Sequence, residues 1–370
     1  MRLYQREPDG RNNQRMIGKD DIRAAVGAGI LSEAQAASLT SLADSRRGAR
    51  ENLDPGDEPF ELFRGFNEVF IVIGLGILAL GWIGIVSFGA LEYISSVQTY
   101  MIVTSVLGAV VIWLLSEYFI RRRRMVAPAI ALSLMFGGNA LYGFISGFGE
   151  LFMLAQEDYS SLPLPLALST LALLLFWFRF RVPFALAVIA LCAFLVSVLI
   201  AGNSAGAPED LRSMFLLSAG GPFAFITLGL GLIVFVIAMV FDMSDPHRVT
   251  RRSANGFWLH VVAAPALVNT IALSLLTETA GGSNLMLLLV LTLIALIAII
   301  IDRRSFLIAA IGYIVILSNT VFDGRQAVFT VFSLGVFLVF LGARWERIRA
   351  FLMKRMPGFI PRHRLPPAGG

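Results

Sequence analysis

The sequence of 370 residues has one cysteine, Cys192, and three histidines, and only 15% of its residues are charged. A single cysteine excludes a disulfide-stapled secreted scaffold. Soluble domains carry about 25% charged residues, whereas 57% of this chain is hydrophobic. A soluble core cannot hide so much apolar surface and leave enough polar residues for the outside. The low charge therefore predicts that most of the chain lies in lipid.

Motifs for catalysis and for metal binding are scarce as well. The histidines His247, His260 and His363 have no histidine, cysteine or carboxylate neighbour at metal-ligand spacing, so we expect no metal site. The sequence contains no P-loop and no nucleophile elbow. We therefore expect no catalytic residue, no cofactor and no enzymatic activity.

The first 67 residues differ from the rest of the chain. They carry 10 basic and 11 acidic residues, which predicts a cytosolic segment. Residues 20–46 are typical of a helical hairpin, in which Ser32 and Gln35 have the spacing of a capping box, and residues 47–60 form a linker. Two short helices bury too little surface to fold securely alone. We expect the hairpin to dock on a protein partner, on a second copy or on the membrane body, and the alternative is a solvated leader without a partner.

Residues 68–342 form the predicted transmembrane domain, because a spanning helix needs about 20 apolar residues. This predicts an all-α polytopic bundle of about ten helices. The ten apolar runs are 69–90, 99–120, 126–147, 162–178, 183–202, 222–241, 256–276, 285–301, 306–322 and 327–342. The fourth, eighth, ninth and tenth runs are short, so one pair of them can instead be re-entrant.

The arginines between these runs indicate an orientation. Lysine and arginine in short loops stay on the cytoplasmic side of a membrane. With the N-terminus inside, the inner loops hold Arg121–Arg124, Arg179, Arg181, Arg248, Arg251, Arg252, Arg303 and Arg304, whereas the outer loops hold Arg212 and Arg325. The pattern predicts that both termini are cytoplasmic.

Residues 343–370 are predicted to form a basic amphipathic tail. Five basic residues alternate there with Trp345, Ile348, Phe351 and Leu352. Such a segment lies on anionic lipid headgroups at the cytoplasmic face. Because it follows directly after the last run, we expect lipid and not nucleic acid to be its partner.

Two features within the membrane are candidates for function. The uncharged stretch from Ser213 to Phe241 is too long for one upright helix, and Gly220, Gly221 and Pro222 provide a break that leaves Leu211 to Ser218 as an outer interfacial helix. Broken helices form binding sites in carriers, although a glycine pair more often serves helix packing. The second feature is a set of polar residues at membrane depth, which bind a solute if they face one cavity and otherwise form hydrogen bonds between helices. This set comprises Asn139, Tyr142, His260, Asn269 and Asn319.

Two segments of the chain are similar to each other, and a third resembles other proteins. Residues 73–78 and 228–233 are alike and open two five-helix halves, as in the inverted repeats of ten-helix exporters. The segment from Gly29 to Gln35, followed by a glycine-rich first span, resembles uncharacterised bacterial multi-pass inner-membrane proteins of the domain-of-unknown-function type. This resemblance implies an inner-membrane location and carries no activity.

The sequence leaves two functions open. One is a permease-like carrier of a small neutral or zwitterionic solute. The alternative is a membrane scaffold or regulator that recruits a cytosolic partner through residues 16–46.

Overall fold

The computed structural model describes residues 19–46, 66–93, 96–150, 158–206, 208, 210, 212–248, 250–277, 283–303, 306, 325–355 and 364–366. Within these ranges the regular structure is entirely helical and includes eleven α-helices. The predicted linker over residues 47–60 lies outside the described residues.

Two short helices form the described part of the N-terminal segment: α1 (Lys19–Gly27) and α2 (Glu33–Arg46). Helix α2 starts with the predicted capping box, because the Gln35 amide N–H donates to Ser32 Oγ at 3.2 Å and the Ser32 amide N–H donates to Gln35 Oε1 at 3.0 Å. The two helices contact each other and bury Ile22, Ala36 and Ala37.

The long helices of the chain follow the predicted apolar runs. They are α3 (Phe66–Glu92), α4 (Val97–Ser116) with its π-helical extension η2 (Glu117–Arg122), α5 (Ala127–Phe148), α7 (Pro163–Phe180), α8 (Pro183–Ala205), α9 (Phe223–Met243), α10 (Arg251–Thr277), α11 (Ser283–Ile301) and α13 (Arg325–Arg355). Those from α3 to α10 provide seven segments that are long and apolar enough to cross a membrane. The chain is therefore a multi-pass, membrane-embedded protein. Helices α11 and α13 lie at the eighth and tenth runs, and the ninth run is outside the described residues except for Phe306.

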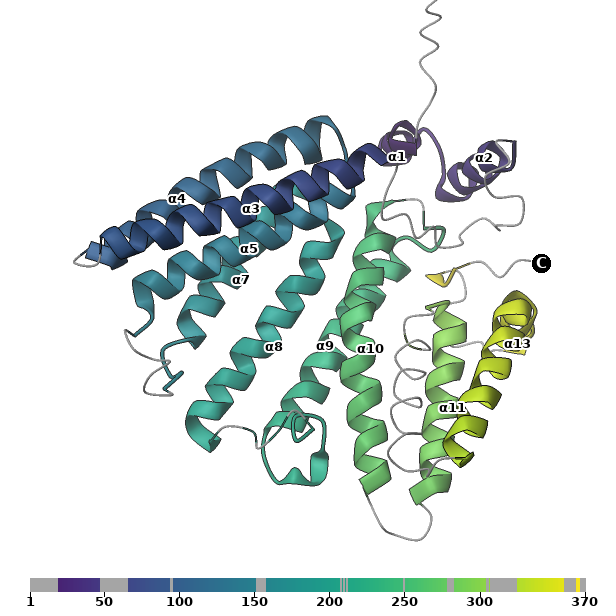
Figure 1. Ribbon diagram of the computed structural model, residues 1–370. Helices are drawn as coiled ribbons and strands as arrows, with labels where there is room; N and C mark the ends of the chain where they lie inside the picture. Colours follow the sequence, from purple (N-terminus) through teal and green to yellow (C-terminus); the bar gives the residue numbers. More distant parts are fainter. Residues whose placement is uncertain are drawn as a thin grey trace, which may run out of the picture.

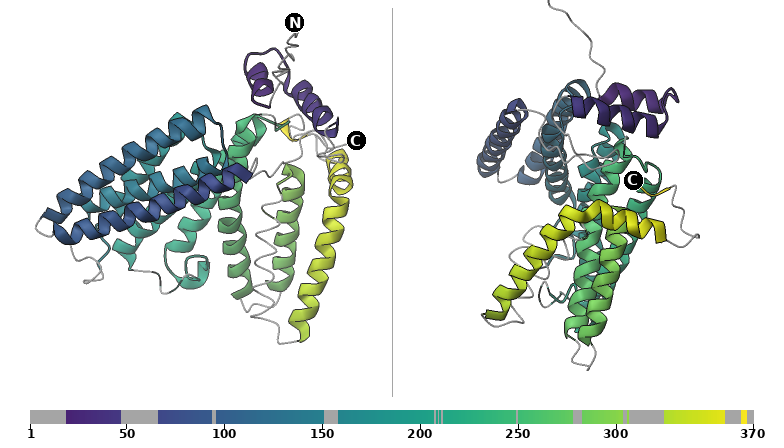
Figure 2. Two further views of the ribbon diagram at one scale, coloured as in Figure 1. Left: turned by 45° about the horizontal axis from the view of Figure 1, so that its top comes forward. Right: turned by 90° about the vertical axis from the view of Figure 1, so that its right-hand side faces the viewer.

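The helices pack mainly against their neighbours in the chain and form a fan (Figure 1). Helices α3 and α4 lie at one end of this fan and α11 and α13 at the other (Figure 2). The core of the first half is aromatic: Trp113 of α4 and Phe136 of α5 pack around Phe176 and Phe180 of α7. Helices α8, α9 and α10 continue the row, since α10 packs against all of α8, α9 and α11.

The segment before α9 differs in part from the prediction. Helix α9 does begin directly after the Gly220-Gly221-Pro222 break, with Gly220 at a φ of +76°. The expected outer helix from Leu211 to Ser218 is wrong for its described residues, which form turns and the 3₁₀-helix η3 (Leu217–Ala219). The Leu217 amide N–H donates to Ser274 Oγ of α10 at 2.9 Å. That bond holds the segment in a turn.

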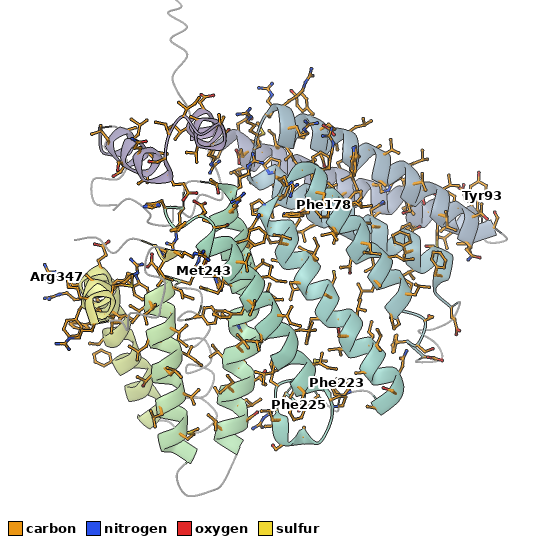
Figure 3. The ribbon with its side chains drawn as sticks, turned by 180° about the vertical axis from the view of Figure 1, so that it is seen from behind. Tyr93, Phe178, Phe223, Phe225, Met243 and Arg347 are labelled. Carbon is orange, nitrogen blue, oxygen red and sulfur yellow. The ribbon has the colours of Figure 1, made fainter. Side chains whose placement is uncertain are left out.

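The C-terminal region also differs from the expected amphipathic tail. Helix α13 continues without a break to Arg355, well beyond residue 342. Trp345 and Ile348 pack against Ile299 of α11, so the protein itself covers apolar side chains that were expected to lie on lipid. Arg347 is on the exposed side of the helix (Figure 3).

Candidate functional site: a buried ion cluster

Three ionisable side chains from three elements meet inside the protein at the end of α9. Asp242 accepts a hydrogen bond from Arg303 Nε at Oδ2 (2.9 Å) and another from Arg303 Nη2 at Oδ1, and His260 Nε2 lies 2.9 Å from the same Oδ2. The exposed fractions are 5% for Asp242, 0% for His260 and 1% for Arg303. We call these three residues the Asp242 cluster. Ionisable groups at such burial in a membrane protein are costly and usually functional.

Helix α10 provides the space for this arrangement. Gly256 and His260 are four residues apart and so share one face of α10. A Cβ atom at Gly256 would overlap Asp242 Oδ1 and would come within 3.2 Å of the Ala238 carbonyl oxygen. Only glycine at this position allows the Asp242 carboxylate to lie flat against α10.

The start of α10 is fixed by a second buried carboxylate. Asp245 Oδ2 accepts hydrogen bonds from the Thr250 amide N–H at 2.9 Å and from Thr250 Oγ1 at 2.7 Å. A carboxylate at a helix N-terminus satisfies backbone N–H groups that otherwise lack a partner. Asp245 therefore anchors the turn between α9 and α10. It thereby sets the position of α10 along its axis at which Gly256 and His260 face Asp242.

A neighbouring group of residues holds the turn that carries Arg303. Asp302 accepts hydrogen bonds from Arg248 Nη1 at 2.9 Å and from Trp345 Nε1 of α13 at 2.7 Å, and Arg349 Nε lies 4.0 Å away. Arg349 also donates to the carbonyl oxygen of Pro366. We call Arg248, Asp302, Trp345 and Arg349 the Asp302 cluster. It ties the α9–α10 turn, the end of α11 and α13 together.

Both clusters lie at the same end of the fan. Met243, which follows Asp242, is at the end of α9 nearer to α1 and α2, and Phe223 marks the opposite end of that helix (Figure 3). Burial lowers the pKa of Arg303 from its usual range to about 9. The guanidinium therefore stays charged at pH 7, and its pairing with Asp242 is ionic.

Two of the predicted cavity residues lie far along the chain from this cluster. Asn139 Nδ2 donates to the Ser105 carbonyl oxygen at 2.8 Å, and Ser105 Oγ donates to the Asn139 carbonyl oxygen at 3.0 Å. Tyr142 is on the same helix, α5, and its hydroxyl lies near Thr104 of α4. Both residues thus belong to the α4–α5 contact. Asn139 is hydrogen-bonded across it, whereas the Tyr142 hydroxyl is buried without a hydrogen-bond partner among the described residues.

The remaining candidates that the structure describes are not gathered into one cavity either. Asn269 is half-buried on α10, and its distance of nine residues from His260 places the two on opposite faces of that helix. Asn319 lies outside the described residues. Gly220, Gly221 and Pro222 are at the far end of α9, opposite Asp242. Of the predicted site residues within the described ranges, only His260 lies in the Asp242 cluster.

Sequence reasoning missed Asp242 and assigned Arg303 a different role. Asp242 lies just beyond the sixth apolar run, and Arg303 is one of the inner-loop arginines that indicate the orientation. His260 is not an isolated histidine, because it has a carboxylate partner 18 positions away. The signal in the sequence was a carboxylate directly after an apolar run, preceding a helix that contains a histidine.

The described residues include no group of three or more histidine, cysteine or acidic side chains that could hold a metal ion. Comparisons with protein-family models, with curated proteins and with solved structures found no match. The chemistry of the Asp242 cluster allows it to bind a proton and to break and re-form an ion pair between helices.

Proposed function

We propose that the protein is a permease-like carrier of a small neutral or zwitterionic solute. One observation carries this proposal: the Asp242 carboxylate pairs with both His260 and Arg303, which come from different elements, at an exposure of 5% or less. An apolar contact would join these helices at a lower cost, because buried ion pairs rarely add stability over well-packed apolar residues. A carrier, however, needs contacts between helices that can open and close during alternating access.

The proposed carrier is a bacterial inner-membrane protein with ten spans and both termini in the cytoplasm. The arginines support this orientation. Three of the described turns contain an arginine with a positive φ, namely Arg124, Arg181 and Arg248, and all three turns fall on the side that the loop charges predict to be cytoplasmic. Anionic lipid headgroups are the proposed partner of the exposed basic residues of α13, which are Arg344, Arg347, Lys354 and Arg355.

Transport by purified protein tests the proposal. The wild type, Asp242→Asn and Asp158→Asn are placed in vesicles of phosphatidylethanolamine and phosphatidylglycerol, and the uptake of radiolabelled amino acids, sugars and polyols is measured. Asp158 is an exposed acidic residue outside the cluster and serves as the matched control. We expect the wild type and Asp158→Asn to move at least one of these solutes and Asp242→Asn to lose that transport. If the wild type moves none of them faster than empty vesicles, or if Asp242→Asn transports as well as the wild type, the proposal is wrong.

A specific observation also favours a scaffold that recruits a cytosolic protein. Helix α1 contacts the membrane body through an ion pair, in which Asp20 Oδ2 lies 3.1 Å from Arg124 Nη1, and in α2 the Glu33 Oε2 atom lies 3.8 Å from His247 Nδ1. Ile30 and Leu39 of the same segment remain 75% and 42% exposed. These apolar side chains provide a surface for a partner.

Crosslinking in cells tests this second function. We expect a crosslinked partner with the wild type that is lost both when residues 16–46 are deleted and when Ile30 and Leu39 are replaced by serine. Replacement of the exposed Arg347 by glutamine is the control, which should leave the crosslink intact. A partner that is still captured after the deletion would contradict recruitment through this segment.

A further inference from the structure

The hydrogen-bonding pattern of the Asp242 cluster determines which atoms of Asp242 and His260 carry a hydrogen. Because Arg303 donates two hydrogen bonds to Asp242, the carboxylate is ionised and can only accept. His260 Nε2, 2.9 Å from Asp242 Oδ2, must therefore carry the hydrogen. Within the part of the chain that the structure describes, His260 Nδ1 is buried without a hydrogen-bond partner. The neutral imidazole thus has one lone pair left, and that is a site for a proton.

The charges around His260 balance only while the imidazole is neutral. Asp242 and Arg303 cancel each other. Around them the charges are those of Asp245 after α9, of Arg248 and Asp302 in the two turns, and of Arg349 on α13. Beyond Asp245 lie Glu33 of α2, Arg252 of α10 and the titratable His247, and the charges of Glu33 and Arg252 offset each other. Helix α8 also packs against α10, and its sequence contributes no charge. The three acidic and three basic residues sum to zero, so a proton on His260 would leave one uncompensated positive charge at 0% exposure, which is costly.

Arg303 is the cation of the Asp242 cluster that can separate from Asp242. Arg303 lies in the turn after α11, whereas Asp242 and His260 are fixed within α9 and α10. Phe235 and Phe306 lie against the His260 ring at centroid distances of 5.5 and 5.6 Å. The imidazole is therefore held in place by these rings while its counter-charge can change.

We propose that His260 is a proton-binding site and that its protonation displaces Arg303 from Asp242. The incoming proton binds to Nδ1, Nε2–H continues to donate to Asp242, and the imidazolium becomes the counter-charge of the carboxylate in place of the guanidinium. Charge is conserved within the buried site, because one cation enters and one leaves. The site gives the proposed carrier its coupling ion, and in this respect it rests on the proposed function.

The Asp302 cluster gives this exchange a structural consequence. Arg303 is adjacent to Asp302, which is bonded to Trp345 of α13 and to Arg248 of the α9–α10 turn. When Arg303 leaves Asp242, the turn after α11 loses its ion pair to α9 but stays bonded to Trp345 of α13 and to Arg248 of the α9–α10 turn. Protonation therefore removes the link between Asp242 and Arg303 and leaves Arg248 to connect the end of α11 to the α9–α10 turn.

Nuclear magnetic resonance of the full-length protein with ¹⁵N-labelled histidine tests the proton site. The protein is studied without any solute in nanodiscs of phosphatidylethanolamine and phosphatidylglycerol between pH 5 and pH 8. The chain has three histidines, and His260→Gln identifies the signal of interest by its loss. We expect the His260 signal to convert to the protonated form at a higher pH in Arg303→Gln than in the wild type, whereas Arg303→Lys and the control Arg347→Gln should behave like the wild type. An unchanged midpoint in Arg303→Gln would overturn the competition for Asp242.

A measurement on the wild type keeps the proposal testable if Arg303→Gln does not fold. Phenylglyoxal modifies accessible arginines, and mass spectrometry reports the modification of Arg303 relative to the exposed Arg347. We expect this ratio to rise as His260 takes up its proton and to stay low at every pH in His260→Gln. A ratio that does not change while His260 titrates would mean that protonation does not release Arg303, and the proposal would be wrong.

These outcomes are separate from the outcome of the transport assay. A His260 that titrates in competition with Arg303, in a protein that moves no solute, would support the proton site and refute the carrier. Solute uptake without such titration would support the carrier and refute the proton site.

Discussion

At the scale of single residues, Gly256 determines whether the Asp242 cluster can form. Its backbone lies against the Asp242 carboxylate, where any Cβ atom would collide. Gly256→Ala therefore pushes Asp242 away from His260 and Arg303. We expect a loss of about 1–3 kcal/mol of stability, the usual range for overpacking, which thermal unfolding in detergent measures as a lower midpoint.

Gly229 of α9 provides the matched control for this substitution. A Cβ atom at Gly229 meets nothing within 4 Å, and alanine is the better helix former. Gly229→Ala should leave the unfolding midpoint unchanged or raise it slightly. Equal effects of the two substitutions would show that the contact between Gly256 and Asp242 is unimportant for the fold.

The site could be predicted from the sequence only in part. His260 stood out because a histidine within an apolar run is rare and costly. Its partner Asp242 did not stand out, because whether residues 242 and 260 meet depends on the axial position of α10 relative to α9. Asp245 and Thr250 set that position through their hydrogen bonds. Arg303 sits 61 positions from Asp242. No local spacing rule connects residues so far apart.

At the scale of the helices, the α4–α5 contact is built around small residues and one amide. A Cβ atom at Gly108 would come too close to the Asn139 side chain, and one at Gly143 would overlap Ser105 Oγ. These two glycines let the helices approach until Asn139 reaches the Ser105 carbonyl oxygen at 2.8 Å. The interface therefore uses close backbone approach and hydrogen bonding together, as expected where lipid removes the hydrophobic drive between helices.

Asn139→Ala should weaken this contact without affecting the Asp242 cluster. The substitution removes one hydrogen bond between helices, which is worth about 1 kcal/mol in a membrane. Thermal unfolding should show a lower midpoint, and the proton titration of His260 should be unchanged. Asn203→Ala is the control, because Asn203 bonds to the Ser160 carbonyl oxygen at an exposed site and should have a smaller effect. A titration of His260 that changes in Asn139→Ala would contradict the separation of the two sites.

The attachment of α2 to the membrane body is expected to depend on pH. Burial raises the pKa of Glu33 above its ordinary 4.5, and the charge of Asp245 adds to this effect. A raised carboxyl pKa means that the docked state binds the proton more tightly than the undocked state. The contribution of Glu33 to docking is therefore most favourable below its ordinary pKa, and it weakens as the pH rises through the raised value.

Hydrogen exchange measures this dependence directly. After correction for the intrinsic rates, the amides of α2 should be better protected at pH 5 than at pH 7 in the wild type. Glu33→Gln should flatten this difference. Protection that rises with pH in the wild type would show that burial is not the dominant influence on Glu33.

At the scale of the whole molecule, composition alone predicted the membrane body, because long apolar runs are set by the thickness of the bilayer and need no knowledge of packing. The fan was not predictable in the same way. The likeness of residues 73–78 and 228–233 predicts two five-helix halves but does not indicate that the described helices pack mainly in chain order (Figure 1). A similarity of six apolar residues says little about which helices meet, because packing depends on side chains that lie far apart in the sequence.

The proposed orientation can be tested on the whole molecule because the chain has a single native cysteine, the half-buried Cys192. In a Cys192→Ala background, Asp158→Cys places a thiol in the turn before α7, and Arg252→Cys places one at the start of α10; both positions are exposed. These sites lie at opposite ends of the helices, and the arginine-rich turns predict that the Arg252 end is cytoplasmic. A membrane-impermeant maleimide added to intact spheroplasts should therefore label Asp158→Cys at once and Arg252→Cys only after permeabilisation. The reverse pattern would place the Asp242 cluster near the outer surface, and protons would then reach His260 from outside the cell.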